Sequence, residues 1–275
     1  MKILGILACY NRKEKTKSCI ETLVQKNPEC IITFVVVDDS STDGTSKMLE
    51  ELSNSGKYDI HLLKGTGRLF YSGSMHVGMK YALEKLQANF DYCMLLNDDV
   101  LFFKGCVKKM VAQSQSQNNA VIVGAMSDAT GSLSYSAVKY TKGIRYKKME
   151  IGQWNSRADT FNANGVLIPY VIFRDMGPID SYFVHSLGDF DYGLELTRYG
   201  YKIYVSKEYV GQCENNSNKN TWMDCSLSRR ERLRRKESPK GAPVKQWYYF
   251  LRKHWGIFVA IKGSITPFIR IFFNR

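Results

Sequence analysis

Three short acidic stretches of the sequence contain the residue types that bind ligands and move protons. They are VDDSSTDGT (37–45), LLNDDV (95–100) and HSLGDFDYG (185–193). Carboxylates can accept hydrogen bonds from a ligand, hold a divalent cation or act as general bases. A capped helix or a solvated turn also explains each stretch taken alone. Their positions relative to one another therefore decide what chemistry they can do together.

Asp38 and Asp39 directly follow ITFVVV at 32–37, the clearest strand pattern in the chain. A turn rich in Ser, Thr and Asp comes next and leads into a predicted helix, which places both carboxylates beside a helix N-terminus. Asp39 is suited to accept a hydrogen bond from a nucleobase N–H or a ribose hydroxyl. Asp38 is suited to brace the turn.

Asn97, Asp98 and Asp99 directly follow a second strand pattern, at 91–96. Their hard oxygen atoms suit Mg²⁺ or Mn²⁺, and such an ion can bridge two phosphates and stabilise a departing diphosphate. Because both acidic strand ends belong to one predicted parallel sheet, they can meet in the same crevice.

Asp189 and Asp191 open a predicted helix at 189–199, where the helix dipole favours carboxylates. N-terminal capping explains both residues. The functional alternative makes one of them a general base that takes a proton from an acceptor hydroxyl. His185 is a further candidate for the base or for a phosphate contact, and a purely structural histidine fits equally well.

The elements that position these residues alternate between strand and helix. Strand patterns occur at 2–8, 32–37, 61–63, 91–96 and 120–124. Helix-compatible segments lie between them at 11–25, 41–52, 73–86 and 104–114. This alternation predicts an α/β fold with a mostly parallel sheet and helices on both faces. Ligands of such sheets bind beyond the carboxyl ends of the strands, where the first two acidic stretches lie.

The pattern loosens from about residue 125. Residues 127–160 have no helical period and predict short antiparallel strands or loops. Strand patterns return at 162–172 and 202–205, and a strongly basic helical segment follows at 228–237. An aromatic tail, WYYFLRKHWGIF, comes after a break at Pro239, Gly241 and Pro243.

The composition is that of a globular protein with a basic end. Of the 275 residues, 44% are apolar and 24% are charged, which excludes a disordered or collagen-like chain. Residues 226–275 hold 13 Lys and Arg against 2 Asp and Glu, so this segment accounts for most of the net charge of +13. A basic tail indicates nucleic acid, anionic lipid or another anionic partner.

Several features bear on location and on other enzyme classes. The seven cysteines have no metal-binding spacing and predict reduced thiols in a cytoplasmic protein. No apolar run is long enough to predict a transmembrane helix, and no secretory signal is recognised. The glycine-containing GTGRLFYSGSMHVG matches neither phosphate-binding consensus, and GxSxG and HExxH are absent.

Six blocks, taken in order and spacing, resemble family 2 glycosyltransferases of the GT-A fold. The blocks are ACYNR (8–12), VVDDSSTDGT (36–45), LFYSGSMHVG (69–78), LLNDDV (95–100), FNANGVLIP (161–169) and GDFDYGLELTRYGYKIYV (188–205). PVKQWYYFLRKHW (243–255) is also similar to the endings of bacterial rhamnosyl- and hexosyltransferases of surface glycan assembly. The resemblance implies a GT-A (Rossmann-like) catalytic domain at 1–225 and a basic, aromatic, helical C-terminal extension at 226–275.

The resemblance also implies a nucleotide-sugar donor, UDP-hexose or dTDP-rhamnose, and Mn²⁺ or Mg²⁺ as cofactor. The residues implied to bind the donor are Ala8, Tyr10, Arg12, Asp38, Asp39, Arg68, Gly73, Asn97 and Asp98. The metal is expected on Asp99, because Asn97 replaces the first acid of the motif usually written DxD, and His254 is expected to help hold the metal and the diphosphate. Asp189 resembles the catalytic base of inverting members, with Gly188-Asp189 in place of their usual Glu-Asp pair.

These observations predict an inverting, metal-dependent glycosyltransferase in the cytoplasm, at the inner face of the membrane if the tail binds lipid. The expected acceptor is a hydroxyl of a growing cell-surface glycan carried on a lipid or a protein, with no nucleic-acid partner. A sugar nucleotidyltransferase and a non-catalytic nucleic-acid-binding protein are the two alternatives. For the tail, membrane or acceptor docking and packing within the chain or in a homo-oligomer both stay open.

Overall fold

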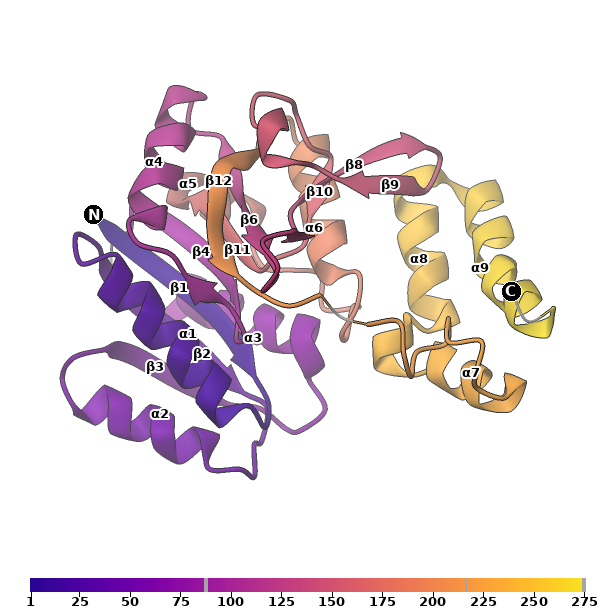
Figure 1. Cartoon of the computed structure of the whole chain (residues 1–275), viewed down its shortest axis with the longest axis horizontal. Helices are drawn as coiled ribbons and strands as arrows, with labels where there is room; N and C mark the ends of the chain where they lie inside the picture. The colour runs from indigo at the N-terminus through magenta and orange to yellow at the C-terminus, as the bar shows by residue number, and fades with distance from the viewer. Residues whose placement is uncertain (87–88, 216, 274–275) are drawn as a thin grey trace.

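The computed structural model describes residues 1–86, 89–215 and 217–273. Within them, a large sheet covered by helices lies on one side of the molecule, and the helices of the tail stand on the other (Figure 1). The α/β class predicted from the sequence is confirmed. Residues 274–275 of the predicted extension lie outside the described residues.

The first half of the chain folds as alternating strands and helices, as predicted. Its elements are β1 (Lys2–Cys9), α1 (Lys13–Lys26), β2 (Ile31–Asp38), α2 (Thr45–Asn54), β3 (Asp59–Lys64), α3 (Phe70–Lys85) and β4 (Tyr92–Asn97). Strands β3, β2, β1 and β4 lie side by side in that order, and each neighbouring pair is parallel. The apolar runs of β1, β2 and β4 are almost wholly buried, as expected for parallel strands covered on both faces.

The second half of the chain extends the same sheet with mixed directions. Its elements are β5 (Leu101–Phe102), α4 (Cys106–Ser116), β6 (Val121–Ser127), β7 (Leu133–Tyr135), β11 (Gly165–Pro169), α5 (Tyr170–Met176) and β12 (Ile203–Gln212). Strand β11 runs antiparallel between β4 and β6, whereas β12 is parallel to β6. The sheet is therefore parallel over its first four strands and mixed beyond them. Residues 170–172, which the sequence pattern assigned to a strand, begin α5 instead, because an apolar run alone does not distinguish a strand end from a buried helix.

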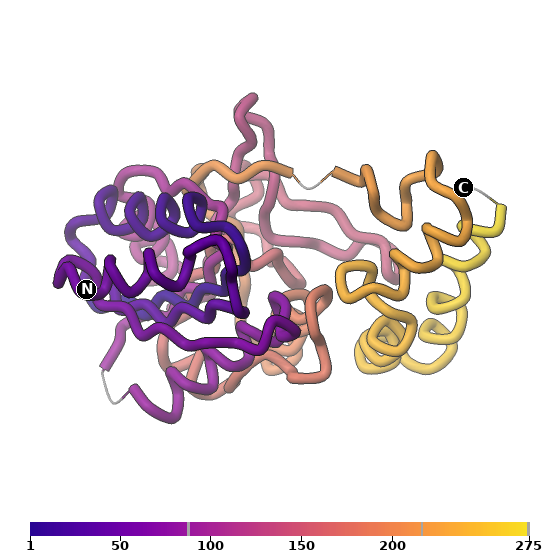
Figure 2. Tube along the Cα trace, turned by 90° about the horizontal axis from the view of Figure 1, so that it is seen from below, coloured from indigo at the N-terminus to yellow at the C-terminus, as the bar shows by residue number. Residues whose placement is uncertain are grey.

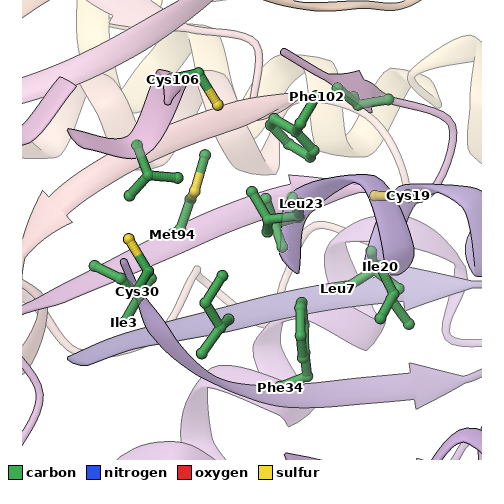
Figure 3. Packing of buried hydrophobic residues seen from close by; sticks show 14 of the residues in the cluster. Ile3, Leu7, Cys19, Ile20, Leu23, Cys30, Phe34, Met94, Phe102 and Cys106 are labelled. Carbon is green, nitrogen blue, oxygen red and sulfur yellow. The ribbon is translucent and has the colours of Figure 1, made fainter. Parts of the chain in front are cut away.

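Helices cover both faces of the sheet. Helices α1, α2 and α4 pack on one face, and α3, α5 and α6 (Gly188–Arg198) pack on the other. Figure 3 shows the first face, where strand residues such as Leu7 and Phe34 meet Ile20 and Leu23 of α1. This packing fixes the strand ends on which the predicted site depends.

A small antiparallel sheet lies between the large sheet and the tail. It consists of β8 (Ala137–Lys142), β9 (Arg145–Lys148) and β10 (Thr160–Phe161), with the short 3-10 helix η1 (Ile151–Gln153) in the connection. The hairpin of β8 and β9 reaches toward the tail helices (Figure 2), and the rings of Tyr140 and Trp255 lie 4.8 Å apart. The antiparallel strands predicted for 127–160 are thus present.

The basic tail is helical, as predicted. It contains α7 (Arg229–Lys236), a short 3-10 turn η2 (Pro239–Gly241), α8 (Val244–Trp255) and α9 (Ile257–Phe272). Phe250 and Leu251 of α8 are buried in a small cluster that also contains Phe183, which lies in the segment between α5 and α6. None of the helices in the described residues is long and apolar enough to cross a membrane.

Candidate active site

The strand ends that precede the first acidic stretches are level with one another. Ala8 of β1 lies opposite Val37 of β2 and Asn97 of β4 in the parallel register. The loops after these strands therefore open at the same edge of the sheet, where α/β folds bind ligands. Tyr10, in the loop after β1, is 53% exposed at this edge.

Asp38 holds the turn after β2 in place. Its fully buried carboxylate accepts hydrogen bonds from the Ser41 backbone N–H, at 3.0 Å, and from the hydroxyls of Ser41 and Ser46. These partners lie in the turn and at the start of α2. The structure thus places Asp38 in the bracing position, inside the turn.

Asp39 ties the end of β2 to the loop between β3 and α3. Asp39 Oδ1 accepts a hydrogen bond from Gly67 N at 2.7 Å, and Oδ2 accepts one from Phe70 N at 2.9 Å. A Cβ atom on Gly65 would lie 2.6 Å from Asp39 Oδ1, so the close approach of this loop requires a glycine. Arg68 lies exposed in the same loop.

The two acids after β4 share one cation. Arg12 Nη1 lies 2.9 Å from Asp98 Oδ1 and 2.9 Å from Asp99 Oδ2. Burial raises the pKa of Asp98 to about 6, although the charge of Arg12 acts in the opposite direction. Carboxylate oxygens that converge on one cationic group fit a divalent ion in its place, and such donors suit Mg²⁺ or Mn²⁺. Asn97 contributes its backbone oxygen to a hydrogen bond from the Cys19 thiol at 3.2 Å.

Sequence reasoning missed Cys213, which lies against Asp99. Cys213 Sγ is 3.4 Å from Asp99 Oδ1, and both residues line a hollow of about 310 Å³ together with Lys15 and Glu214. No local signal pointed to Cys213, because the strand predicted from the sequence ended at residue 205, whereas β12 runs to Gln212 and Cys213 directly follows it.

Asp189 lies in the first turn of α6. Its Oδ1 accepts a hydrogen bond from Phe190 N at 2.9 Å and its Oδ2 one from Ala163 N at 3.3 Å. Burial raises the pKa of Asp189 to about 6, which leaves it ionised at neutral pH yet more basic than an exposed carboxylate. Burial also raises the pKa of Tyr71 well above its usual range, and the charges of Asp189 and Asp98 raise it further. Tyr71 therefore lies near both carboxylates and links the two parts of the site.

The glycine before Asp189 has a packing reason. A Cβ atom on Gly188 would lie 2.5 Å from Ser72 Oγ of α3. The starts of α3 and α6 are so close that Gly73 N donates a hydrogen bond to Val184 O at 3.0 Å. A glutamate at position 188 has no room here, which explains why this chain departs from the Glu-Asp pair.

Burial of the His185 ring, together with the positive charges of Lys240 and Arg12, lowers the pKa of its imidazole to about 4. A histidine of such low pKa is a poor base at neutral pH. Lys240 brings a cation of the tail to this side of the site.

Asp191 contacts the tail. Its buried carboxylate lies 2.8 Å from Lys253 Nζ and 2.8 Å from His254 Nε2. The Lys253 ammonium also lies 3.6 Å from Asp180 Oδ2 and 3.9 Å from Glu195 Oε1. We call these five residues the tail latch, because they join α8 to α6. Asp191, Glu195 and His254 are close enough together to hold a metal ion, and in this structure the Lys253 ammonium lies within 4 Å of both carboxylates.

The tail latch contains two of the predicted site residues. His254, predicted as a metal ligand beside Asp99, instead contacts Asp191 in this structure. Asp191, the alternative base, has one carboxylate oxygen on Lys253 and the other on His254. The physical reason is that a buried carboxylate needs charged or hydrogen-bonding partners, and the end of α8 supplies the Lys253 ammonium and the His254 ring.

The chain shares its fold with known glycosyltransferases. S. aureus TarS 1-349, solved with UDP-GlcNAc, matches with a TM-score of 0.60 and 14% identity over 98% of this chain and 90% of that chain. The mannosyltransferase PcManGT from Pyrobaculum calidifontis, solved with GDP-Man and Mn²⁺, matches with a TM-score of 0.59 and 11% identity over 99% of this chain and 73% of that chain. GalNAc-T7, solved with UDP, GalNAc and Mn²⁺, matches with a TM-score of 0.58 and 11% identity over 75% of this chain and 42% of that chain. No curated protein matches the chain.

These similarities confirm the GT-A fold predicted from the sequence. The family model for glycosyl transferase family 2 matches residues 6–166, which is more than half of the chain and includes both acidic strand ends. The chain therefore belongs to glycosyl transferase family 2, and the protein is a glycosyltransferase.

Proposed function

We propose that the protein transfers a sugar from a nucleotide-sugar donor to a hydroxyl of a growing glycan, with inversion at the anomeric carbon and with a divalent cation. One observation carries the proposal: Asp98 and Asp99 converge on a cation, and Asp189, a carboxylate of raised pKa, lies near Tyr71, whose pKa is also raised by the charge of Asp98. Displacement at an anomeric carbon needs a base on one face and a stabilised diphosphate on the other.

Asp189 is the proposed general base. Its carboxylate takes the proton of the acceptor hydroxyl as that oxygen attacks the anomeric carbon. The bond from this carbon to the diphosphate oxygen breaks, and the diphosphate leaves with the electron pair. Attack from the face opposite the leaving group inverts the configuration. The backbone N–H groups of Phe190 and Ala163 orient the carboxylate.

Asp99 and Asp98 are the proposed residues that hold Mn²⁺ or Mg²⁺, in the place that the Arg12 guanidinium takes in this structure. The ion supplies Lewis-acid stabilisation of the departing diphosphate. Arg12, once released from the carboxylates, is available to the phosphates, and Lys240 provides a second cation near His185. The complexes of PcManGT and GalNAc-T7 with Mn²⁺ support the use of a divalent cation.

The proposed donor is a nucleoside diphosphate sugar, with UDP-hexose and dTDP-rhamnose as candidates. Tyr10 is exposed where a nucleobase can stack, next to the strand end that presents Asp39. The complex of TarS with UDP-GlcNAc supports a UDP-linked sugar, and that of PcManGT with GDP-Man shows that a neighbour of the same fold takes another nucleotide.

The proposed acceptor is a surface glycan on a lipid or a protein, and the proposed location is the cytoplasm. All seven cysteines are unpaired, six of them buried, which supports a reducing compartment. The proposed division of the chain is a catalytic part at 1–225 and an extension at 226–275, which the tail latch fixes to α6.

The experiment is a screen of UDP-, GDP- and dTDP-sugars with Mn²⁺, Mg²⁺ or chelator, with the released nucleotide identified by chromatography. We expect nucleoside diphosphate from one donor class, only with the metal, and none from Asp99→Ala. Glu84→Ala, an exposed acid on α3, is the matched control and keeps full activity. Release of sugar 1-phosphate would indicate nucleotidyl transfer instead, and full release of nucleoside diphosphate in the presence of chelator would contradict the metal assignment.

A further inference from the structure

Helix α9 exposes a continuous apolar surface at the end of the molecule away from the large sheet (Figure 1). Six large apolar residues of α9 are between 48% and 87% exposed: Ile257, Phe258, Ile261, Ile265, Ile269 and Phe272. At the 3.6-residue period of an α-helix, these positions fall on one side. We call these six residues the α9 face. An apolar patch of this kind on a folded protein marks a contact with a partner.

The opposite side of α9 is fixed to the rest of the tail. Its buried positions recur at helical spacing and are Ala260, Gly263, Ser264, Pro267 and Ile271. A Cβ atom on Gly263 would lie 2.3 Å from Leu251 Cδ1 of α8, so the two helices are in close contact. The α9 face therefore cannot be buried by turning the helix over, because its other side already packs on α8.

Basic side chains surround the α9 face. The Arg229 guanidinium of α7 lies 5.4 Å from the centre of the Phe272 ring. Lys262 and Arg270 are exposed on α9 itself. Apolar side chains beside lysines and arginines are the pattern of helices that lie in the headgroup region of an anionic bilayer.

We propose that the α9 face inserts into the interface of an anionic lipid bilayer, with α9 lying along the surface and the basic residues contacting the headgroups. The helix has 16 residues and three interruptions of its apolar run, at Lys262, Pro267 and Arg270, so it lies on the bilayer and does not span it. This inference concerns a partner surface and is independent of which sugar the enzyme transfers.

Charge favours lipid over a second copy of the chain. Residues 226–275 hold 13 Lys and Arg against 2 Asp and Glu. A symmetric dimer through the α9 face would bring two such basic tails together, whereas an anionic leaflet attracts one. The tail latch and the β8–β9 hairpin connect α8 to the domain that contains Asp189, so docking of α9 also sets the position of the active site relative to the bilayer.

The test uses the full chain and extruded vesicles of phosphatidylcholine alone or with about 30% phosphatidylglycerol, a proportion chosen to give the negative surface potential that attracts basic segments. Flotation measures the bound fraction. We expect binding to the anionic vesicles only, with weaker binding at higher salt. Ile265→Glu is expected to abolish it, and Arg229→Gln with Lys262→Gln to lower the partition coefficient by roughly 25-fold, since each basic residue contributes a factor of about five.

Val171→Glu is the matched control, because it places the same charge on an equally exposed apolar residue of α5. It is expected to bind vesicles as the wild type does. Equal binding by Ile265→Glu and the wild type would overturn the proposal, as would equal binding to neutral vesicles. A wild type that ignores vesicles but sediments as a dimer, with Ile265→Glu monomeric, would assign the α9 face to a second copy of the chain.

Discussion

Asp189 and Asp191 lie two residues apart on helix α6, and their carboxylates have different partners. Asp191 is 2.8 Å from both Lys253 Nζ and His254 Nε2, at the junction with α8. Asp189 accepts hydrogen bonds from the backbone N–H groups of Phe190 and Ala163, and its burial raises its pKa to about 6. Asp191 is therefore suited to hold the tail, and Asp189 is suited to take a proton.

The raised pKa of Asp189 predicts an effect on stability. The folded state binds this proton more tightly than the unfolded state does, so ionisation destabilises the fold. This loss of unfolding free energy is absent below about pH 4, develops as the pH rises from about 4 to 6, and is complete above the pKa of Asp189 in the folded state. Asp189→Asn should therefore be more stable than the wild type at pH 7.5, by at most about 3 kcal/mol.

Urea unfolding at pH 4.5 and pH 7.5 measures this effect. The difference in free energy of unfolding between Asp189→Asn and the wild type should be large at pH 7.5 and small at pH 4.5. The free energy of unfolding of Glu84→Gln, an exposed change on α3, should lie within about 0.5 kcal/mol of the wild-type value at both pH values. A difference that is the same at both pH values would mean that Asp189 is not a buried carboxylate of raised pKa.

The position of Arg12 predicts that its guanidinium competes with the divalent ion for the carboxylates of Asp98 and Asp99. Its guanidinium contacts the same Asp98 and Asp99 oxygens that are proposed to hold the ion. At pH 8, Arg12→Gln should bind Mn²⁺ without donor roughly fivefold more tightly, because the half-exposed guanidinium competes for these oxygens with about 1 kcal/mol. The same variant should bind the donor diphosphate more weakly. Electron paramagnetic resonance of free Mn²⁺ measures the first effect, and weaker Mn²⁺ binding would contradict it.

Asp39 predicts a combined loss of stability and nucleotide binding. Asp39→Ala leaves the backbone N–H groups of Gly67 and Phe70 without their acceptor, at about 0.5–1.5 kcal/mol for each lost hydrogen bond. The loop at 65–70 should loosen, and affinity for the nucleoside diphosphate should fall with it. Asp59→Ala, an exposed acid on β3, is the control. Calorimetric titration and urea unfolding that both match the wild type would remove Asp39 from the site.

Much of the fold and part of the site can be predicted from local sequence. The apolar runs at 32–37 and 91–96 predict buried strands. The acidic residues that follow these strands meet at one edge of the sheet, because the strands are parallel. The direction of β11 could not be predicted in this way, because an apolar run has no direction. The contact of Cys213 with Asp99 and that of His254 with Asp191 join residues far apart in the chain, so no local pattern reveals them.

The tail latch predicts a measurable coupling between α8 and α6. Lys253→Met leaves a buried Asp191 carboxylate without its ammonium partner, which should destabilise the protein by about 2 kcal/mol and raise hydrogen exchange in α8. Asp191→Asn combined with Lys253→Met should recover part of this loss, since the unpaired charge is gone. Lys245→Met, an exposed change on the same helix, is the control. Additive effects of the two substitutions would contradict a direct pair.

The rate of sugar transfer by Asp189→Asn, measured with the donor and metal found by screening, tests the proposed catalytic role most directly. The amide has the shape of the carboxylate but does not take a proton at neutral pH. Transfer should fall by about 10²–10⁴-fold, with donor and Mn²⁺ affinities unchanged, while Asp191→Asn keeps the greater part of the rate. Wild-type transfer by Asp189→Asn together with an inactive Asp191→Asn would contradict the assignment and make Asp191 the base.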